Sequence, residues 1–390
     1  MDRAEQIHQR FHVPFDYPVV FTKGVFQGAN PALAEAISRG GDPAPSRVLA
    51  FVDDGLIGAD SQLPTRMERW FSQYGEIARL AAPPRAVPGG EAMKNDYRLL
   101  MEVVDMILEF RLCRHSVILV VGGGAVLDAV GFGASIVHRG LRVVRVPTTV
   151  LAQSDAGIGV KNGMNLHGGK NTIGTFHPPF AVLNDAVFLR SLPWRHWIAG
   201  VSEAFKVALI KDAVFFETLC RAAPALRRRD EDVMETIVRR CAALHLDHIR
   251  TQGDPFEWGP ARPLDFGHWA AHRLESMTNY ALVHGEAVAI GIALDTLYAG
   301  TQGWIRSPDA AQLLTALDIC GLPLSHPAME RRLGDGTLEL LSGLEDFREH
   351  LGGQLCVTFP RGIGDRIEVN HVDGAEMTRL ILHLAEKANV

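Results

Sequence analysis

The chain has 390 residues, which corresponds to two or three domains of about 150 residues each. With 47% hydrophobic and 22% charged residues, it has the composition of a globular protein, which excludes disordered and fibrous classes. The formal net charge of −6 provides no basic field for nucleic acid or for an anionic membrane, so we expect neither as a partner.

The cysteines and the N-terminus indicate a compartment. Five widely spaced cysteines without a CxxC pair fit neither a disulfide framework nor a thiolate zinc site, and they are typical of a reducing environment. Residues 1–15 place acidic and polar side chains where a signal peptide needs an apolar core. The apolar stretch 116–137 contains Asp128 and five glycines, so it predicts a strand, a turn and a helix rather than a membrane span. We expect a soluble protein of the cytoplasm.

The first half of the chain alternates short β-branched runs with helical patterns. These patterns predict strands over 48–53, 117–121 and 142–147, and helices over 96–110 and 125–138. The alternation favours a Rossmann-like parallel sheet with helices on its faces.

From about residue 196 onward the periodicity is helical, with few strand runs. We therefore expect a fold of class α/β plus α, with an α/β domain over 1–190 followed by a mostly helical domain over 191–390.

A glycine turn follows the second predicted strand. Gly122, Gly123 and Gly124 open a helix, where free backbone N–H groups and the helix dipole favour phosphate. The GxGxxG fingerprint fails because Leu127 stands where the third glycine belongs, so the turn fits a cofactor phosphate and a tight structural turn alike. Asp53, at the end of an earlier strand, is either a ligand for a ribose hydroxyl or a solvated acid.

The stretch 155–171 is rich in Gly, Asn and Lys. It approaches a Walker A loop, but the spacing is one residue too long and Asn171 replaces the required Ser or Thr, which excludes an ATPase. We expect a flexible loop that presents Lys161, Asn165, Lys170 and Asn171. Such a loop suits a phosphorylated or polyhydroxylated ligand, and it is equally compatible with a solvated surface.

Histidines and one acid have the residue types of a metal site. His268 and His272 are four residues apart and would share one helix face, and His284 begins another helical pattern. Glu203 is an acid in an apolar helix, where burial is costly without a partner. Imidazoles with one carboxylate suit a divalent ion such as Zn²⁺, although histidines in a helix are also common without a metal.

In order along the chain, these segments resemble the 3-dehydroquinate synthase-like sugar phosphate cyclases. The matching segments run over about 88–291 with family-like spacing. They are PGGEAMKN (88–95), GGGAVLD (122–128), HRG (138–140), VPTTVLAQSDAGIGVKNGMN (146–165), GKNTIGTFHPP (169–179), SLPWR (191–195), AGVSEAFK (199–206), DFGHWAAH (265–272) and VHGEAVAIG (283–291).

The resemblance implies a homodimer in which the N-terminal domain binds NAD and the helical domain binds substrate and one divalent metal, zinc or cobalt. The implied metal ligands are Glu203, His268 and His284. The implied NAD contacts are Asp53, Glu91, Lys94, Gly122, Gly123, Gly124, Asp128, Thr148 and Thr149, with Lys170 nearby. The implied catalytic and substrate contacts are Asp155, Lys161, Asn171, Lys206, His272 and, from the neighbouring subunit, Arg139.

The reaction implied by the resemblance is net redox-neutral. NAD⁺ transiently oxidises a sugar hydroxyl at the metal, phosphate leaves by β-elimination, the hydride returns, and an intramolecular aldol closes a carbocycle. Lys161, Asn171, Arg139 and His272 would hold the phosphate through charge-assisted hydrogen bonds. Lys206 would orient the hydroxyls beside the metal.

Four positions depart from the pattern of true dehydroquinate synthases. His245 stands where Lys is typical, Asp265 stands where Asn is typical, and Asp365 stands where Lys is expected. Arg262 lies six residues before His268 instead of seven. An Asp beside an anion repels it, so we expect an uncarboxylated substrate such as sedoheptulose 7-phosphate or a hexose 6-phosphate.

Three alternatives remain at this stage. The chain is compatible with an authentic 3-dehydroquinate synthase and with a metal-dependent polyol dehydrogenase that accumulates NADH. A non-catalytic binding protein with the same fold is the third, although an acid with two imidazoles has little structural use in such a protein.

Overall fold

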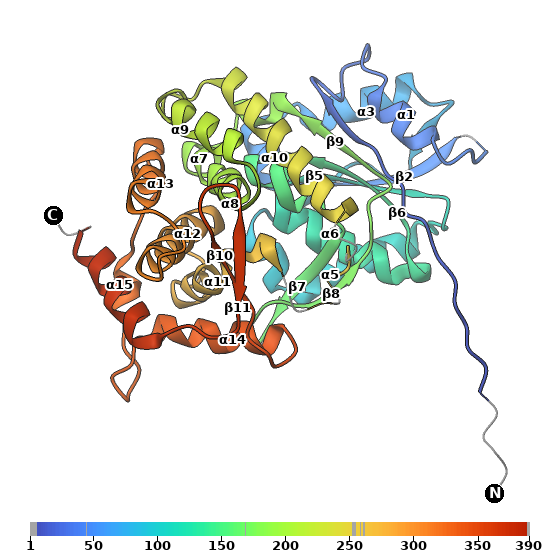
Figure 1. The fold of residues 1–390 in the computed structure, drawn as a ribbon. Coiled ribbons are helices and arrows are strands. Elements are labelled where there is room, and N and C mark those ends of the chain that lie inside the picture. Colours follow the sequence, from blue (N-terminus) through green and yellow to red (C-terminus); the bar gives the residue numbers. More distant parts are fainter. Residues whose placement is uncertain are drawn as a thin grey trace, which may run out of the picture.

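Seven parallel strands form the sheet of the N-terminal half in the computed structural model, which describes residues 6–43, 45–167, 169–251, 255–257, 259 and 262–387 (Figure 1). The strand order is β1-β9-β6-β5-β2-β3, with β4 also pairing with β2. The bounds are β1 Val19–Thr22, β2 Ser46–Asp53, β3 Ala78–Leu80, β4 Arg85–Val87, β5 Val117–Gly122, β6 Arg142–Pro147 and β9 Ala181–Asp185.

Helices cover both faces of this sheet because successive strand residues point to opposite sides. In β2, Leu49 and Phe51 pack with α5 and α6, whereas Val48, Ala50 and Val52 pack with α1 and α3. Burial on both faces explains the continuous apolar runs over 48–52 in β2 and over 117–121 in β5. The helices of this half are α1 Ala32–Ser38, α2 Asp54–Ala59, α3 Leu63–Gln73, α4 Glu91–Asn95, α5 Tyr97–Glu109 and α6 Gly124–Ile136, followed by the 3₁₀ turns η1 Val137–Arg139 and η3 Ala186–Arg190.

The predicted strands and helices of this half are confirmed within one to two residues at most ends. The carboxyl ends of β2 and β5 flank the point where the strand order reverses, because β3 lies on one side of β2 and β5 on the other. In open parallel sheets, ligands bind outside this switch point. Asp53 ends β2 and Gly122 ends β5, so both lie at this edge.

The expectation of a flexible loop over 155–171 is wrong. A π-helix, η2 (Ala152–Ala156), leads into an antiparallel hairpin of β7 (Lys161–Leu166) and β8 (Gly169–Phe176). The side-chain oxygen of Asn162 accepts a hydrogen bond from Arg145, and its nitrogen donates to the carbonyl of His177. Because buried polar groups and glycines hold this hairpin, the apolar alternation that identifies a strand is missing.

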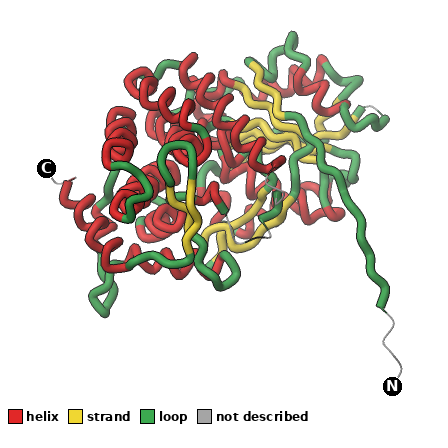
Figure 2. Tube along the Cα trace, viewed as in Figure 1, coloured by secondary structure: helices red, strands yellow, loops and turns green. Residues whose placement is uncertain are grey.

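The second half is mostly helical, as expected (Figure 2). Its elements are α7 Trp194–Ala199, α8 Val201–Lys211, α9 Ala213–Arg227, α10 Glu231–Thr251, η4 Pro263–Asp265, α11 His268–Met277, α12 His284–Thr301, α13 Ser307–Cys320, η5 Pro327–Glu330, η6 Glu339–Leu341, α14 Ser342–His350 and α15 Gly374–Lys387, with a hairpin of β10 Val357–Pro360 and β11 Arg366–Val369. One apolar cluster runs through these helices. The domain division at residue 190 stays a prediction.

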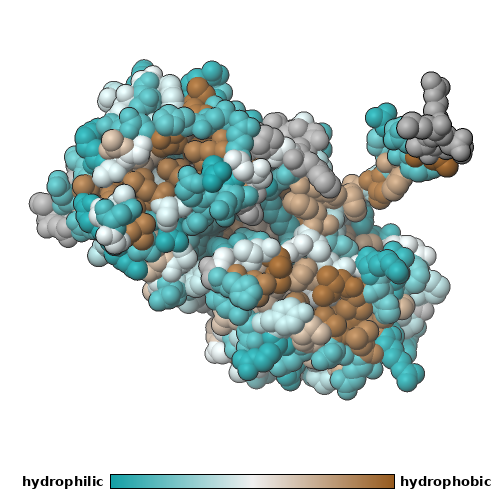
Figure 3. Space-filling model, turned by 90° about the horizontal axis from the view of Figure 1, so that it is seen from below, coloured by the Kyte–Doolittle hydropathy of each residue, from teal (hydrophilic) through white to brown (hydrophobic). Residues whose placement is uncertain are grey.

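The segment before β1 extends away from the body (Figure 1, Figure 3). Its contacts with the body include an edge-to-face packing of Phe15 on Phe256 and a hydrogen bond from the Tyr17 hydroxyl to the carbonyl of Ile158. Phe11 is 80% exposed on this segment. None of the helices described here combines the length and the apolarity that crossing a membrane requires.

A backbone contact between α11 and α12 generates the first prediction. A Cβ built on Gly291 of α12 would lie 2.1 Å from the carbonyl oxygen of Gly267, the residue before His268. Gly291→Ala is therefore expected to lower the free energy of unfolding by about 1–3 kcal/mol through overpacking. Gly300→Ala on the same helix is the control, since a Cβ there meets nothing within 4 Å. Denaturant unfolding of both variants tests this, and equal effects would contradict it.

Candidate active site

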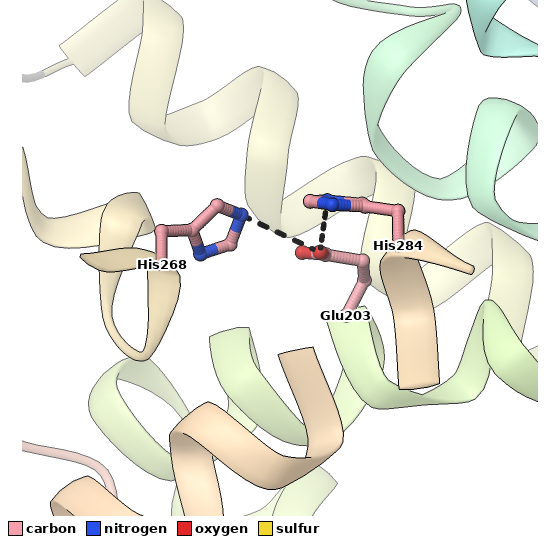
Figure 4. Close-up of side chains that lie close together, drawn as sticks. All are labelled: Glu203, His268 and His284. Atoms are coloured by element: carbon pink, nitrogen blue, oxygen red, sulfur yellow. Dashed lines mark ion pairs between the residues drawn. The ribbon is translucent and has the colours of Figure 1, made fainter. Parts of the chain in front are cut away.

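Three side chains distant in the sequence converge where helices α8, α11 and α12 meet (Figure 4). The carboxylate oxygen Oε1 of Glu203 lies 3.8 Å from Nε2 of His268 and 3.6 Å from Nε2 of His284. Both histidines are the first residues of their helices. Single ligand atoms from the three residues all lie within 4.8 Å of one another. We call Glu203, His268 and His284 the metal cluster.

The partners of the two imidazoles set their tautomers. Nδ1 of His268 lies 3.1 Å from the carbonyl oxygen of Phe266, which only accepts, so Nδ1 donates. Nδ1 of His284 lies 3.0 Å from a carboxylate oxygen of Glu275. With Nδ1 engaged in this way, the Nε2 atoms of both rings point to Glu203, and each can bind a cation when it carries no proton.

The residues present fit a divalent metal. The Glu203 carboxylate has no exposed surface, and neither oxygen accepts a hydrogen bond of acceptable geometry from any residue in the described ranges. The Lys206 ammonium lies 2.5 Å from Oε2, and the His284 ring, whose pKa is raised to about 9, lies 3.6 Å from Oε1. One carboxylate and two imidazoles are a donor set that zinc-type ions prefer, with a further position left for substrate oxygens.

Two other clusters of metal-ligand types share members with this one, and a lysine lies against each. Asp155, Glu203 and His245 are near one another, and so are His272, Glu275 and His284. Lys206 contacts Glu203, and Lys170 pairs with Glu275. These ammonium groups supply part of the positive charge that the carboxylates need, and Glu203 shares Lys206 with both of its clusters.

Burial and neighbouring charge prepare two of the cluster residues for a metal. Burial alone would raise the pKa of Glu203, but Lys206 and His284 lower it to about 2. Burial and Lys206 lower the pKa of His268 to about 4. At neutral pH, Glu203 is therefore ionised and His268 is neutral, which are the forms that bind a metal ion.

Asp155 links the sheet edge to the helical half. It lies in the π-helix η2, a conformation that recurs at functional sites. Its carboxylate oxygens lie 3.1 Å from Nε2 of His245 on α10 and 3.9 Å from Nζ of Lys206 on α8. Burial raises the pKa of Asp155, but the charges of His245 and Lys206 lower it well below its usual value. Asp155 and Lys206, both expected at the substrate, are thus brought together beside Glu203.

The residues expected to bind NAD gather at the carboxyl edge of the sheet. Asp53 accepts a hydrogen bond from the N–H of Gly55, and burial raises its pKa. Gly122 passes so close that a Cβ on it would lie 3.3 Å from that of Asp53. Gly123 and Gly124 open α6 and allow the equally close approach of Thr149 and Ala156, respectively, while the N–H of Thr148 donates to the Gly122 carbonyl.

A second group of expected residues forms a polar network beside that edge. The Lys94 ammonium lies 2.8 Å from Asp128 and also contacts Asn171. Glu91 accepts a hydrogen bond of 2.7 Å from Asn165. Asn171, expected at the substrate phosphate, is therefore brought to the cofactor-side lysine by the β7–β8 hairpin.

Lys161 begins β7 and is paired with carboxylates. Its Nζ lies 2.6 Å from Oε1 of Glu257, and Glu257 Oε2 lies 3.8 Å from Nη1 of Arg262. The carboxylates of Asp265 and Glu257 raise the pKa of the Lys161 ammonium above its usual value. Burial raises the pKa of Asp265, whereas Lys161 and His268 bring it down to about 2. Asp265 is thus an ionised neighbour of Lys161.

Three further expected residues are placed differently. His272 packs its ring 5.3 Å from that of His268 and 5.9 Å from that of His284, so it borders the metal cluster. Arg139 is exposed, has a positive φ of 64°, and makes no ion pair or hydrogen bond with a described residue. Asp365 is exposed in the turn between β10 and β11 and pairs with Arg361, so the argument from substrate charge rests on Asp265 instead.

Sequence reasoning missed Glu275 and Asp295. Glu275 lies 3.0 Å from Nδ1 of His284. It is three residues after His272 and seven after His268, so the helical periodicity already placed it on their face of the helix and could have identified it. Asp295 is fully buried and accepts hydrogen bonds from the N–H of Gly267 and the indole of Trp269, on either side of His268. Burial raises the pKa of Asp295 to about 7.

Two models of one protein family match consecutive parts of the chain. The model of the 3-dehydroquinate synthase N-terminal domain matches residues 85–199, and that of the 3-dehydroquinate synthase C-terminal domain matches residues 200–338.

Individual relatives point the same way. The 2-epi-5-epi-valiolone synthase of Streptomyces hygroscopicus subsp. jinggangensis is 33% identical over 96% of this chain and 88% of its own. Its structure, solved with NAD⁺ and Zn²⁺ bound, superimposes with a TM-score of 0.86 at 32% identity, covering 98% of this chain and all of that one.

Two further matches agree with this family. The 3-dehydroquinate synthase of Halorhodospira halophila is 34% identical over 75% of this chain and 83% of its own. A 2-deoxy-scyllo-inosose synthase, solved with carbaglucose-6-phosphate, NAD⁺ and Co²⁺, shares the fold at 20% identity, with a TM-score of 0.71 over 93% of this chain and 95% of its own.

The protonation of His284 generates a prediction about metal binding. Burial lowers the pKa of His284, but Glu275 and Glu203 raise it more, to about 9. Since a metal binds only the neutral imidazole, its uptake at pH 7 should release about one proton, and the apparent affinity should rise about tenfold per pH unit until pH 9. Calorimetric titration with Co²⁺ in buffers of different ionisation enthalpy measures the proton count. His284→Ala should lose the metal, and binding without proton release would contradict the assignment.

Proposed function

This chain belongs to the 3-dehydroquinate synthase-like family of sugar phosphate cyclases, and we propose that it is a carbon–oxygen lyase that converts an uncarboxylated sugar phosphate into a carbocycle with loss of phosphate. The observation that supports this proposal best is the metal cluster, in which a buried Glu203 carboxylate faces two Nε2 atoms beside Lys206. Such a centre can bind and acidify a hydroxyl of a polyhydroxylated substrate.

We propose NAD⁺ and a divalent ion, zinc or cobalt, as the cofactors, since the Streptomyces relative holds NAD⁺ and Zn²⁺. When bound, they supply reversible hydride transfer and polarisation of a substrate hydroxyl. Glu203, His268 and His284 would hold the ion. The glycine turn at 122–124 offers backbone N–H groups at the start of α6 to the cofactor phosphates, and Asp53 offers an acceptor for a ribose hydroxyl.

The chain's own residues would position the sugar. Lys206 lies between Glu203 and Asp155, so its ammonium can donate to a hydroxyl beside the metal cluster while both carboxylates hold it in place. His245 fixes the other oxygen of Asp155. At the far end of the substrate, Lys161 and Asn171 would hold the phosphate, with His272 alongside. In a homodimer the neighbouring subunit's Arg139 would complete this pocket, and Arg139 is exposed here and unpaired with any described side chain.

The charge around Lys161 supports an uncarboxylated substrate. Asp265 is ionised next to it, and Glu257 lies against both Lys161 and Arg262. Lys161 and Arg262 therefore already have acidic neighbours, which leaves little positive charge for a second anionic group on the substrate. A substrate with a phosphate as its single anionic group fits this balance better than one with a second anion.

Turnover assays test the proposal. Protein loaded with Co²⁺ or Zn²⁺ and NAD⁺ is incubated with sedoheptulose 7-phosphate, with hexose 6-phosphates, and with the carboxylated heptulosonate 7-phosphate that dehydroquinate synthases use. We expect phosphate release from an uncarboxylated substrate without accumulation of NADH. Release only from the carboxylated substrate would identify an authentic dehydroquinate synthase, and stoichiometric NADH would identify a polyol dehydrogenase.

Removing the charge of Asp265 tests the substrate argument. Asp265→Asn should improve kcat/KM for the carboxylated heptulosonate, or its binding as a competitor, by about tenfold. A like charge next to a bound anion weakens its binding by roughly as much free energy as one pKa unit represents, which is a factor of about ten. Glu345→Gln is a matched control, since Glu345 is an exposed acid that pairs with Arg348 on α14. An unchanged preference in Asp265→Asn would contradict the role given to Asp265.

A further inference from the structure

Glu275 is a buried carboxylate that none of the expected roles includes. Its side chain is only 2% exposed and lies on the face of α11 that carries His268 and His272. One oxygen lies 3.0 Å from Nδ1 of His284, and the other pairs with the Lys170 ammonium. A buried carboxylate with a histidine on one oxygen and a lysine on the other joins two parts of the site.

Lys170 comes from the opposite side of the site. It lies in β8, its side chain is 10% exposed, and its ammonium is 3.7 Å from Glu91 at the start of α4. Nδ2 of Asn165, on the paired strand, donates to Glu91 and to Asn95, both on α4. The contacts therefore run from His284 through Glu275 and Lys170 to the helix that carries the expected NAD contacts.

The same hairpin makes a second connection to the cofactor side. Asn171, the residue after Lys170, receives a hydrogen bond from Lys94, which is ion-paired with Asp128 on α6. The backbone N–H of Asn171 donates to the side-chain oxygen of Asn165. Lys170 is thus connected to Lys94 through the adjacent backbone and the Asn171 side chain.

We propose that Glu275 and Lys170 are positioning residues that couple occupation of the metal cluster to occupation of the NAD edge. The inference rests on the proposed function for the identity of the two ligands. Glu275 orients the His284 ring so that Nε2 faces the metal position, and Lys170 fixes Glu275 relative to Glu91. An ion at Nε2 orders this chain of contacts, so NAD⁺ meets an α4 and a hairpin already in place.

Reciprocity follows from thermodynamics. If the metal raises the affinity for NAD⁺ by some factor, then NAD⁺ raises the affinity for the metal by the same factor, typically about 5–150-fold for coupled sites. Because the coupling runs through identified side chains, replacing one of them should reduce both effects equally.

The first measurement is metal affinity. Equilibrium dialysis of Co²⁺ against Glu275→Gln should show a 10–100-fold loss relative to the unsubstituted chain, the usual effect of removing a carboxylate that orients a metal-bound histidine. Glu339→Gln is the matched control. Glu339 pairs with Arg273, which lies on the same helix as Glu275, and it does not contact His284. Equal affinity in Glu275→Gln and Glu339→Gln would overturn the role of Glu275.

The second measurement is the coupling itself, and it decides the proposal if Glu275→Gln does not fold. The dissociation constant of NAD⁺ is measured with and without Co²⁺ in the unsubstituted chain, in Lys170→Met and in Lys170→Arg. The ratio of the dissociation constant without Co²⁺ to that with Co²⁺ should be at least about fivefold in the unsubstituted chain and close to one in Lys170→Met. Lys170→Arg keeps the charge and should restore part of the ratio. Thr172→Ala, an exposed position on β8, controls for the hairpin.

The outcomes separate this inference from the function on which it rests. A chain that binds neither NAD⁺ nor Co²⁺ contradicts the proposed function, and the coupling with it. If the chain binds both ligands and Lys170→Met leaves the ratio of dissociation constants unchanged, the coupling alone is overturned.

Discussion

The Glu203 carboxylate has no exposed surface, lies among the apolar helices of the second half, and is ionised. Taking a carboxylate out of water costs several kcal/mol even after the protein relaxes, unless cations and hydrogen bonds replace the lost hydration. Lys206 supplies one cation. The other oxygen faces Nε2 of His268 and Nε2 of His284. In the proposed function, a divalent ion takes the place of the His284 proton between these three groups and offsets the burial.

This constraint explains how the helices around Glu203 are packed. Gly291 lets α12 approach the backbone that precedes His268, and the buried Asp295 holds that backbone through the N–H of Gly267. Glu275 performs the same task for the ring of His284. The proposed ligands therefore lie on helices whose positions are fixed by backbone contact and by buried hydrogen bonds, which is what a preorganised metal site requires.

The parallel sheet supplies the other half of the site through its topology. The carboxyl ends of β2 and β5 meet at the switch point, and the π-helix after β6 carries Asp155 across to His245 and Lys206. Hydride transfer needs cofactor and metal close to one hydroxyl. The fold brings their expected binding residues together by joining a sheet edge to the N-terminal ends of α11 and α12.

Sequence reasoning predicted the parts of this molecule whose signal is local. The strands β2, β5 and β6 are rich in Val, Leu and Ile, because both faces of the sheet are covered, and the helix at 96–110 shows a clear apolar stripe. The short strands β1, β3 and β4 have three or four residues and no such signal.

The remaining differences come from contacts between distant residues. The hairpin of β7 and β8 was expected to be a loop, because partners such as Arg145 and the glycines of its strands determine its shape. Glu257 lies close to Lys161 because of tertiary packing, which cannot be predicted from a single sequence. The candidate metal ligands could be predicted from the sequence only because their histidine spacing coincided with a family resemblance.

One measurement tests the central claim most directly: anomalous diffraction at the cobalt edge from crystals grown with Co²⁺ and NAD⁺. The account predicts a single strong peak about 2.0–2.2 Å from a Glu203 oxygen and from Nε2 of both His268 and His284. Full cobalt loading with the peak elsewhere, or with those side chains turned apart, would contradict it.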